Sequence, residues 1–197
     1  MAQDLNCLCS DIPIRENLKG IELVTQNIST KLTECLVGIS GSYCALGLAE
    51  VREDIREDST YTLPQYYTSN REWLNLEPTT SIDMLSFFYK SSAKTNFSED
   101  FSVYEQDVNL IFWINTEQIY NTTDYISTEE FEQRVLNALS NARFDAIVSI
   151  NSVTDGYNDT WSDFDIVNDD TMKFNFKNYV TFKINLTLNV KETICKC

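Results

Sequence analysis

The residues best suited to chemistry are the cysteines near the two ends of the chain. Cys7 and Cys9 lie close to the N-terminus, and Cys195 and Cys197 lie at the other end of the 197 residues. If the two ends met, four thiolates could hold a tetrahedral zinc ion. The C-x-C spacing is tighter than that of most zinc sites, and terminal segments are often mobile. Free thiols are therefore the preferred interpretation, with disulfide formation in an oxidising medium as the alternative.

A second candidate is the acidic segment from Asp155 to Asp170, DGYNDTWSDFDIVNDD, which is rich in oxygen ligands of the kind that bind Ca²⁺. It lacks the ligand spacing of a calcium loop, so a solvated acidic loop is the preferred interpretation. Large aromatic side chains in a polar loop are typical of partner anchors, although they can also fold back onto the protein's own core. We expect the loop to dock on a neighbouring chain through Tyr157, Trp161 and Phe164.

The usual residues of enzymatic catalysis are missing from the sequence. The chain contains no histidine, which removes Ser-His and Cys-His nucleophilic pairs, histidine metal ligands and imidazole acid–base catalysis. No glycine-rich phosphate loop occurs, and the segment from Gly38 to Ser42 lacks the last glycine of a nucleophile elbow. The 30 carboxylates leave a paired-acid hydrolase open, but no pair can be chosen from the sequence. We therefore predict no enzymatic activity, no cofactor and no metal.

The first element that the pattern predicts is a long helix from Ile14 to Ile39. Asp11 is suited to cap its start and Gly38 to end it. Its apolar stripe could form a coiled coil between subunits, but packing on the protein's own sheet is preferred because the stripe is short for a coiled coil. The stripe advances in steps of four and three and comprises Ile14, Leu18, Ile21, Thr25, Ile28, Leu32, Cys35 and Ile39.

The segment that follows gives weaker signals. We predict a short strand from Tyr43 to Val51 and a charged surface turn from Arg52 to Thr60. The residues from Tyr61 to Pro78 show no clear periodicity and are predicted to form a loop. This loop contains three further candidates for assembly contacts, Tyr66, Tyr67 and Trp73.

The middle of the chain predicts a sheet and a capped helix. Ile82–Tyr89 is expected to be a strand, and Val108–Asn115 carries apolar residues on both faces, as in a central strand covered on each side. Ser127 and Glu130 form a capping box that starts a helix, and Glu130 is spaced for an ion pair with Arg134. The apolar face of this helix comprises Phe131, Val135, Ala138, Leu139 and Ala142.

The most regular pattern lies near the C-terminus. Every even position from Val180 to Val190 is apolar, and every odd position between them is polar. Strict alternation predicts a strand with one buried and one exposed face. Eleven such residues extend roughly 36 Å at ~3.3 Å each, about twice the commonest strand length. A strand of this length can pair with, or pack on, a neighbouring subunit; the alternative is a long hairpin within one subunit.

Together these elements predict an α/β protein of the α+β kind. We expect a mainly antiparallel or mixed sheet with a long C-terminal strand, one long N-terminal helix, and the capped helix packed on the sheet. The chain is 43% hydrophobic with only 5 Gly and 3 Pro, which suits one domain with a sizeable core. We predict a single domain over residues 1–197, with an N-terminal arm at 1–13, a body at 14–193 and a tail at 194–197.

Charge limits the partners of the protein. Lys and Arg number 15 against 30 Asp and Glu, so the net charge is −15. Such a surface repels DNA and anionic membranes, and we expect neither sequence-specific DNA binding nor membrane adhesion. No apolar run approaches the roughly 20 residues that span a bilayer, and no secretory signal is recognised. We therefore expect synthesis in a reducing cytoplasm.

The order of elements resembles the α/β core of bacteriophage tail-terminator and neck ring proteins. The resemblance covers roughly residues 80–193 and follows the segments VNLIFWIN, STEEFEQRVLNALSN, FDAIVSI and VTFKINLTLNV. The composition, rich in Asn, Asp, Ile and Thr, is similar to that of virion proteins of crAss-like phages. The resemblance implies a homo-oligomeric ring between portal and tail, with DNA passing through an acidic lumen. It implies neither an enzymatic role nor any functional residue.

We therefore expect a structural virion protein, assembled in the host cytoplasm, whose partners are copies of itself and the portal, adaptor or tail proteins. One alternative is a non-enzymatic adaptor or binding module that uses the aromatic acidic loop. The other is the hydrolase with a pair of carboxylates.

Overall fold

The computed structural model describes residues 14–36, 43–56, 59–77, 82–99, 102–116, 119, 128–141, 144, 146–165 and 179–191. These residues form three helices and eight strands. The helices are α2 (Gly20–Cys35), α4 (Thr128–Asn141) and α5 (Tyr157–Thr160). The strands are β1 (Tyr43–Leu48), β2 (Glu50–Arg56), β3 (Ser59–Tyr67), β4 (Trp73–Asn75), β5 (Met84–Lys90), β6 (Val103–Asn115), β7 (Ile147–Asp155) and β8 (Tyr179–Lys191).

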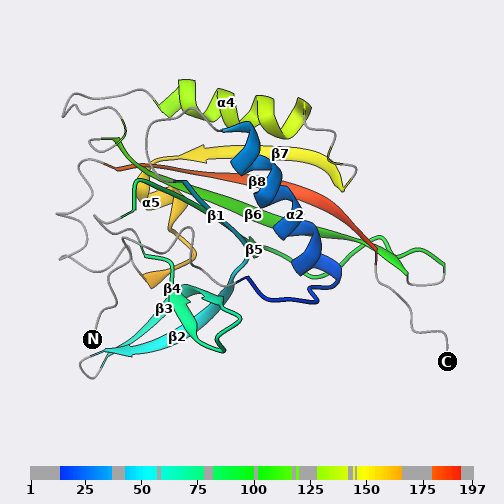
Figure 1. Ribbon diagram of the computed structural model, residues 1–197, viewed down its shortest axis with the longest axis horizontal. Helices are drawn as coiled ribbons and strands as arrows, with labels where there is room; N and C mark the ends of the chain where they lie inside the picture. Colours follow the sequence, from blue (N-terminus) through cyan, green and yellow to red (C-terminus); the bar gives the residue numbers. More distant parts are fainter. Residues whose placement is uncertain are drawn as a thin grey trace.

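The centre of the fold is a five-stranded sheet with the order β1-β5-β6-β8-β7. Strand β1 is parallel to β5, and the other neighbours are antiparallel, so the sheet is mixed. A separate antiparallel sheet has the order β2-β3-β4. Figure 1 shows α4 above the large sheet and the small sheet below it. The predicted α+β class with a mixed sheet is confirmed.

Strands β6 and β8 form the longest pairing of the sheet. Their 13 residues pair from Val103 opposite Lys191 to Asn115 opposite Tyr179 with no bulge. The even positions of β8 from Phe182 to Val190 are fully buried, which confirms the predicted buried face. The opposite face is only partly exposed, and Thr181 on it is buried, so the predicted exposed face is wrong there. Because β7 pairs with the other edge of β8, the long strand is an internal strand of its own subunit. Of the two alternatives for the long strand, pairing within one subunit describes its central residues, although its longest partner is β6 and not the adjacent strand of a hairpin.

Helices α2 and α4 cover one face of the large sheet. From α2, Ile21, Ile28 and Leu32 are buried against apolar residues of the sheet, which confirms the predicted packing on the protein's own sheet. The helix lies so close to β1 that a Cβ on Gly47 would meet the Oε1 atom of Gln26 at 2.8 Å. The Ser29 hydroxyl donates a hydrogen bond to the carbonyl of Leu46 at 2.6 Å. These contacts hold α2 in register with β1.

The start of the first helix differs from the prediction. The helix begins at Gly20 rather than Ile14, because Asn17 and Gly20 adopt left-handed backbone angles with φ of 62° and 54°. Ile14 is consequently outside the helix and 47% exposed, and Cys35 lies exposed in its last turn. The expected capping and final residues, Asp11, Gly38 and Ile39, lie outside the described residues.

The capped helix agrees with its predicted pattern over the part that is described. Phe131, Val135 and Leu139 are buried against the sheet. Arg134 donates a hydrogen bond to the carboxylate of Glu130 at 2.7 Å, which confirms the predicted ion pair. Ser127 and Ala142, which complete the predicted cap and apolar face, lie outside the described residues.

The small sheet and α5 cover the opposite face of the large sheet. Ile111 and Trp113 of β6 are fully buried on this side, so the prediction of a central strand covered on both faces is confirmed. The predicted turn at 52–60 and loop at 61–78 are wrong, because these residues form strands β2, β3 and β4. Their burial explains the difference: Leu63 and Tyr66 of β3 are 2% and 4% exposed and pack on the large sheet.

None of the described helices has the length and apolar character needed to cross a membrane. The expected arm at 1–13 and tail at 194–197 lie outside the described residues, and the single-domain organisation stays a prediction.

Leu186 tests the dependence of the fold on the β6–β8 pairing. The side chain is fully buried at the centre of β8, so Leu186→Ala should lower the free energy of unfolding by about 2–5 kcal/mol through lost burial and a residual cavity. Lys191→Ala, at the exposed end of the same strand, is the matched control and should change it by less than about 0.5 kcal/mol. Chemical denaturation measures both; similar losses in the two variants would contradict the assignment.

Candidate functional site

The aromatic residues of the acidic segment lie mainly inside the protein. Trp161 has no exposed surface, and Phe164 is 4% exposed. Trp161 packs on Phe87 of β5, and Phe164 packs on Tyr89 of the same strand. Tyr157 is half-buried beside them. The alternative that these rings fold back onto the core therefore describes Trp161 and Phe164, and the expectation that Trp161 anchors a partner is wrong because its side chain does not reach the surface.

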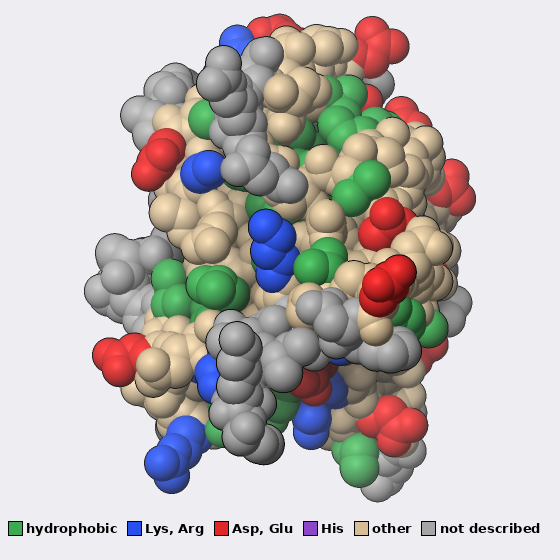
Figure 2. All heavy atoms as spheres, turned by 90° about the vertical axis from the view of Figure 1, so that its right-hand side faces the viewer, with side chains coloured by type: hydrophobic (Ala, Val, Ile, Leu, Met, Phe, Trp, Pro, Cys, Tyr) green, Lys and Arg blue, Asp and Glu red, His purple; other side chains and the backbone are tan. Residues whose placement is uncertain are grey.

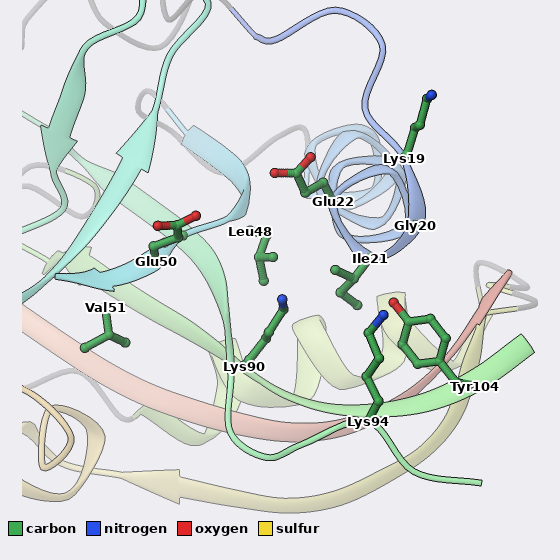
Figure 3. Close-up of a pocket in the computed structure, with 11 residues that line it drawn as sticks. Lys19, Gly20, Ile21, Glu22, Leu48, Glu50, Val51, Lys90, Lys94 and Tyr104 are labelled. Carbon is green, nitrogen blue, oxygen red and sulfur yellow. The ribbon is translucent and has the colours of Figure 1, made fainter. Parts of the chain in front are cut away.

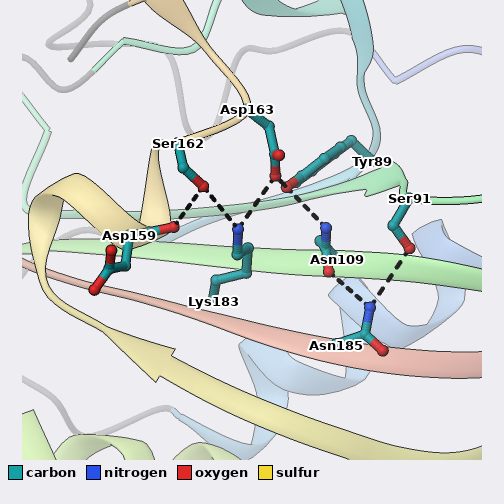
Figure 4. Close-up of polar contacts among 8 residues, drawn as sticks. All are labelled: Tyr89, Ser91, Asn109, Asp159, Ser162, Asp163, Lys183 and Asn185. Carbon is teal, nitrogen blue, oxygen red and sulfur yellow. Dashed lines mark hydrogen bonds and ion pairs between the residues drawn. The ribbon is translucent and has the colours of Figure 1, made fainter.

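A row of polar contacts fastens this segment to the large sheet (Figure 4). The carboxylate of Asp163 accepts hydrogen bonds from the hydroxyl of Tyr89 and from the amine of Lys183, the latter at 3.2 Å. The amide of Asn109 donates to the Tyr89 hydroxyl at 2.8 Å and accepts from Asn185 at 2.9 Å. The row therefore connects residues of β5, β6 and β8 with the segment that carries Trp161.

The ionisation of Asp163 follows from these contacts. Burial by itself raises its pKa, but the hydrogen bonds from Tyr89 and Lys183 and the charge of Lys183 outweigh burial and lower the pKa. Burial and the hydrogen bond to Asp163 raise the pKa of Tyr89. Asp163 is consequently ionised and Tyr89 protonated at neutral pH. The groups lock one another in place, and we interpret the cluster as a structural clasp.

A groove lies at the start of α2, between that helix and the junction of β1 with β2. It encloses about 650 Å³, which lies within the usual range of ligand sites. Three of its lining residues are lysines: Lys19 before the helix, Lys90 at the end of β5 and Lys94 in the loop that follows. Figure 3 shows the amine of Lys90 directed into the space between Leu48 and Ile21, and that of Lys19 directed away.

The carboxylates of the groove are neutralised by arginines, whereas two of its lysines have no carboxylate nearby in the described part of the chain. Its two carboxylates, Glu22 and Glu50, are paired with arginines: Arg15 lies 2.9 Å from Glu22, and Arg52 lies 3.5 Å from Glu50. Among the described residues, neither Lys19 nor Lys90 has a carboxylate within 4.0 Å. The amine of Lys94 lies 4.0 Å from the ring centre of Tyr104, which is a cation–π contact. The groove therefore presents ammonium groups on a strongly acidic protein.

The predicted loop aromatics lie beside this groove. The rings of Tyr67 and Trp73 are 4.8 Å apart, with the guanidinium of Arg52 4.0 Å from the Trp73 ring. On the other side, the guanidinium of Arg15 lies 5.4 Å from the Tyr67 ring. Trp73 is 36% exposed and Tyr67 half-buried, so this stack forms part of the surface. Tyr66 is buried, and its hydroxyl donates a hydrogen bond to Gln26 at 3.4 Å.

Exposed apolar side chains are concentrated in the same part of the chain. Eight large hydrophobic residues of the described chain are exposed, and five of them belong to residues 14–23 or to the small sheet. These five are Ile14, Leu23, Val51, Ile55 and Trp73. We call the groove, the stack and these residues the N-terminal surface. Figure 2, which views the end of the molecule where α2 begins, shows basic side chains along the middle and acidic ones mostly toward the right margin.

Metal binding and acid chemistry find little support among the described residues. Within the described ranges, no group of three His, Cys, Asp or Glu residues could hold a metal ion. The cysteines of the proposed zinc site, at 7, 9, 195 and 197, lie outside those ranges. Glu132 on α4 has a raised pKa, first because of burial and then because of the negative charges of Asp155 and Glu129. Its Oε1 atom is buried and accepts no hydrogen bond from the described residues.

No protein-family model matches the sequence, and no curated protein matches it.

The lysines and the exposed residues of β2 were not found from the sequence. Lys19, Lys90 and Lys94 are far apart in the chain and follow no motif, so only the packing of α2 beside β5 brings them together. Val51 was predicted to end the strand that starts at Tyr43, and Ile55 lay in the charged stretch predicted to be a turn, so neither was placed on the exposed strand β2.

Asp163→Asn tests the clasp. The neutral amide loses the ion pair with Lys183, so we expect a stability loss of about 1 kcal/mol at pH 7, small because the carboxylate is partly exposed. Since the folded pKa is lowered, the contribution of Asp163 is present above its unfolded pKa and lost as the pH falls below about 4. Wild type and variant should therefore converge in acid. Hydrogen exchange of residues 157–165 should accelerate in the variant.

Asp159→Asn removes a carboxylate from the same segment without touching Lys183 or Tyr89, and it serves as the control. Equal destabilisation by both variants at pH 7 would mean that the clasp contributes nothing specific.

Glu132→Gln should stabilise the protein at neutral pH. Because the folded pKa of Glu132 is raised, ionisation above that pKa lowers stability, and the amide removes this loss. The gain should stay below about 1 kcal/mol because the group is partly solvated, and it should vanish below about pH 4, where the carboxyl is protonated in both states. Thermal unfolding at several pH values measures it. Glu130→Gln, which breaks an exposed ion pair, should give no gain at any pH.

Proposed function

We propose that this protein is a structural subunit that acts by assembling with other chains, as a component of a homo-oligomeric ring in the neck or tail of a phage virion. The observation that carries the proposal is the groove with three lysines, which is lined by the exposed Val51 and lies next to the surface stack of Tyr67 and Trp73. Exposed apolar groups of this kind, next to polar rims, are typical of protein–protein contacts.

The fold contains the element order on which the resemblance to ring proteins was based. Strand β6, helix α4, strand β7 and strand β8 follow one another in the order that the resemblance requires, and all four contribute to one core. The N-terminal surface, by contrast, is built from residues 14–77, together with Lys90, Lys94 and Tyr104. The shared core would give the subunit its shape, and the N-terminal surface would give it its contacts.

Electrostatics indicates where copies of this chain would meet. Each copy carries a net charge of −15, so two copies repel one another unless positive groups lie at the contact. Since Glu22 and Glu50 are already paired with arginines, Lys90 is the group of the groove that a carboxylate from outside would meet. We propose that an acidic segment of a neighbouring copy docks there. The remaining acidic surface would face the channel, where DNA passes without binding.

A second candidate is a binding module outside a virion. The groove volume of about 650 Å³ favours it, since a single carboxylate- or phosphate-bearing ligand fits a site of that size. Such a module would use the groove rather than the acidic loop, because Trp161 is buried.

Mass measurement in solution separates the two candidates. The ring predicts a large symmetric assembly by light scattering and electron microscopy, either alone or on addition of the neighbouring neck or tail proteins. A monomer that stays monomeric with each of these partners would exclude the ring. Saturable binding of one ligand by that monomer would support the binding module.

Lys90→Glu tests the place of the contact. Reversing this charge should weaken self-association about tenfold, because a neighbour's carboxylate then meets a like charge. Lys191→Glu makes the same change of charge at the exposed end of β8 and should leave association within about twofold of wild type. Sedimentation at several protein concentrations measures both. Equal weakening by the two variants would indicate a general effect of net charge and would place the contact elsewhere.

A further inference from the structure

Strand β2 is the outer strand of the small sheet. Its inner edge pairs with β3 along the whole strand, from Glu50 opposite Gln65 to Arg56 opposite Ser59. In the described part of the chain, no strand pairs with its outer edge. Such an edge is a template for a further extended strand.

The side chains of β2 favour the addition of a strand on that edge. Ile55 is 78% exposed and Val51 is 46% exposed, which is unusual for two large aliphatic residues on one short strand. Because side chains alternate along a strand, Val51, Glu53 and Ile55 share one face. Covering Val51 and Ile55 would remove apolar surface from water.

We propose that β2 pairs antiparallel with β2 of a second copy, about a two-fold axis through Glu53. The strand has the sequence EVREDIR, which is complementary in charge to its own reverse. In this register Glu50 lies opposite Arg56 of the second copy, and Arg52 lies opposite Asp54. The third pair joins two aliphatic residues, Val51 and Ile55. By symmetry each pair forms twice, and opposite charges or apolar groups across two strands stabilise the pairing.

Other registers of the same two strands are unfavourable. A shift of two residues in one direction places Arg52 opposite itself, and a shift in the other direction places Asp54 opposite itself. A shift by a single residue sets the aliphatic side chains against charged ones and turns each strand over. The charge pattern therefore selects the register centred on Glu53.

Both members of the charged pair also make contacts within their own subunit. The guanidinium of Arg52 lies over the Trp73 ring at 4.0 Å, and the carboxylate of Asp54 accepts a hydrogen bond from Asn75 at 3.2 Å. Because Trp73 and Asn75 belong to β4, the self-pair requires Arg52 and Asp54 to turn toward the outer edge of β2. The central residue opposes the pairing, since Glu53 meets Glu53 of the second copy.

This contact goes beyond the proposed ring. A two-fold contact uses the same patch on both copies and closes on itself, so it joins two subunits but cannot propagate around a ring. It depends on β2 alone and not on the lysines of the groove.

Two single charge reversals and their mixture test the proposal. Arg52→Asp places two carboxylates opposite each other in the self-pair, and Asp54→Arg places two guanidinium groups there. Each variant alone should dimerise about tenfold more weakly than wild type. A mixture of the two variants restores both ion pairs, because each chain supplies what the other lacks, and should pair as tightly as wild type. Sedimentation and fluorescence transfer between labelled variants measure this.

The double variant with both changes, Arg52→Asp and Asp54→Arg, should also pair with itself. Glu53→Gln should strengthen dimerisation severalfold, since it removes the central repulsion. Val51→Lys should abolish dimerisation, while Val148→Lys, at a similarly exposed valine of β7 (51%), should not. Circular dichroism checks that each variant is folded.

Failure of the mixture to associate better than the single variants would overturn the self-pairing of β2. That result would leave the ring proposal standing, because Lys90→Glu tests the groove independently. Conversely, a β2 dimer that forms no larger assembly with its neighbours would support this inference and contradict the ring.

Discussion

The structure depends on the pairing of β6 with β8. Thirteen residues of each strand lie in continuous register, and the apolar residues of β8 all face the helices α2 and α4. A sheet that is buried on both sides must pair its backbone N–H and C=O groups with one another. Two long antiparallel strands do this along their length and leave few such groups unpaired at their ends. The other elements are positioned by this pair: β5 and β7 on its edges, the helices on one face, and the small sheet on the other.

The second constraint is the excess of negative charge. A chain with 30 carboxylates and 15 basic groups must keep most of its acids in water, and it uses its few cations where they have a local effect. Lys183 holds Asp163 in the clasp, and Arg15 and Arg52 neutralise the carboxylates of the groove. Lys90 of the groove has no carboxylate within 4.0 Å among the described residues, and it is the reason that we place a contact there.

The groove and the β2 edge differ in what they offer a partner. The groove is concave and basic, so it suits a protruding acidic group from another chain. The edge of β2 has no strand paired with it in the described chain and carries three acidic and two basic residues, so it suits a strand with the same sequence running in the opposite direction.

Much of the fold could be predicted from local sequence, because period and burial coincide there. Three patterns each match a single type of secondary structure. The alternation from Val180 to Val190 and the two apolar faces of Val108–Asn115 match strands, and the stripe of Phe131, Val135 and Leu139 matches a helix. The small sheet could not be predicted, since its strands mix charged, polar and aromatic residues without a period, and only packing against the large sheet makes them extended.

The sequence by itself determined the class of the fold, the long C-terminal strand, the charge, and the lack of histidine chemistry, because these follow from composition and from patterns within single elements. Only the tertiary structure decided that Trp161 is buried, that three distant lysines share a groove, and that β2 has an outer edge. Exposure and proximity are properties of the packed chain. The local sequence around a tryptophan in an acidic segment is the same whether the side chain contacts a partner or packs into its own core. That distinction depends on the position of β5, which no residue near Trp161 specifies.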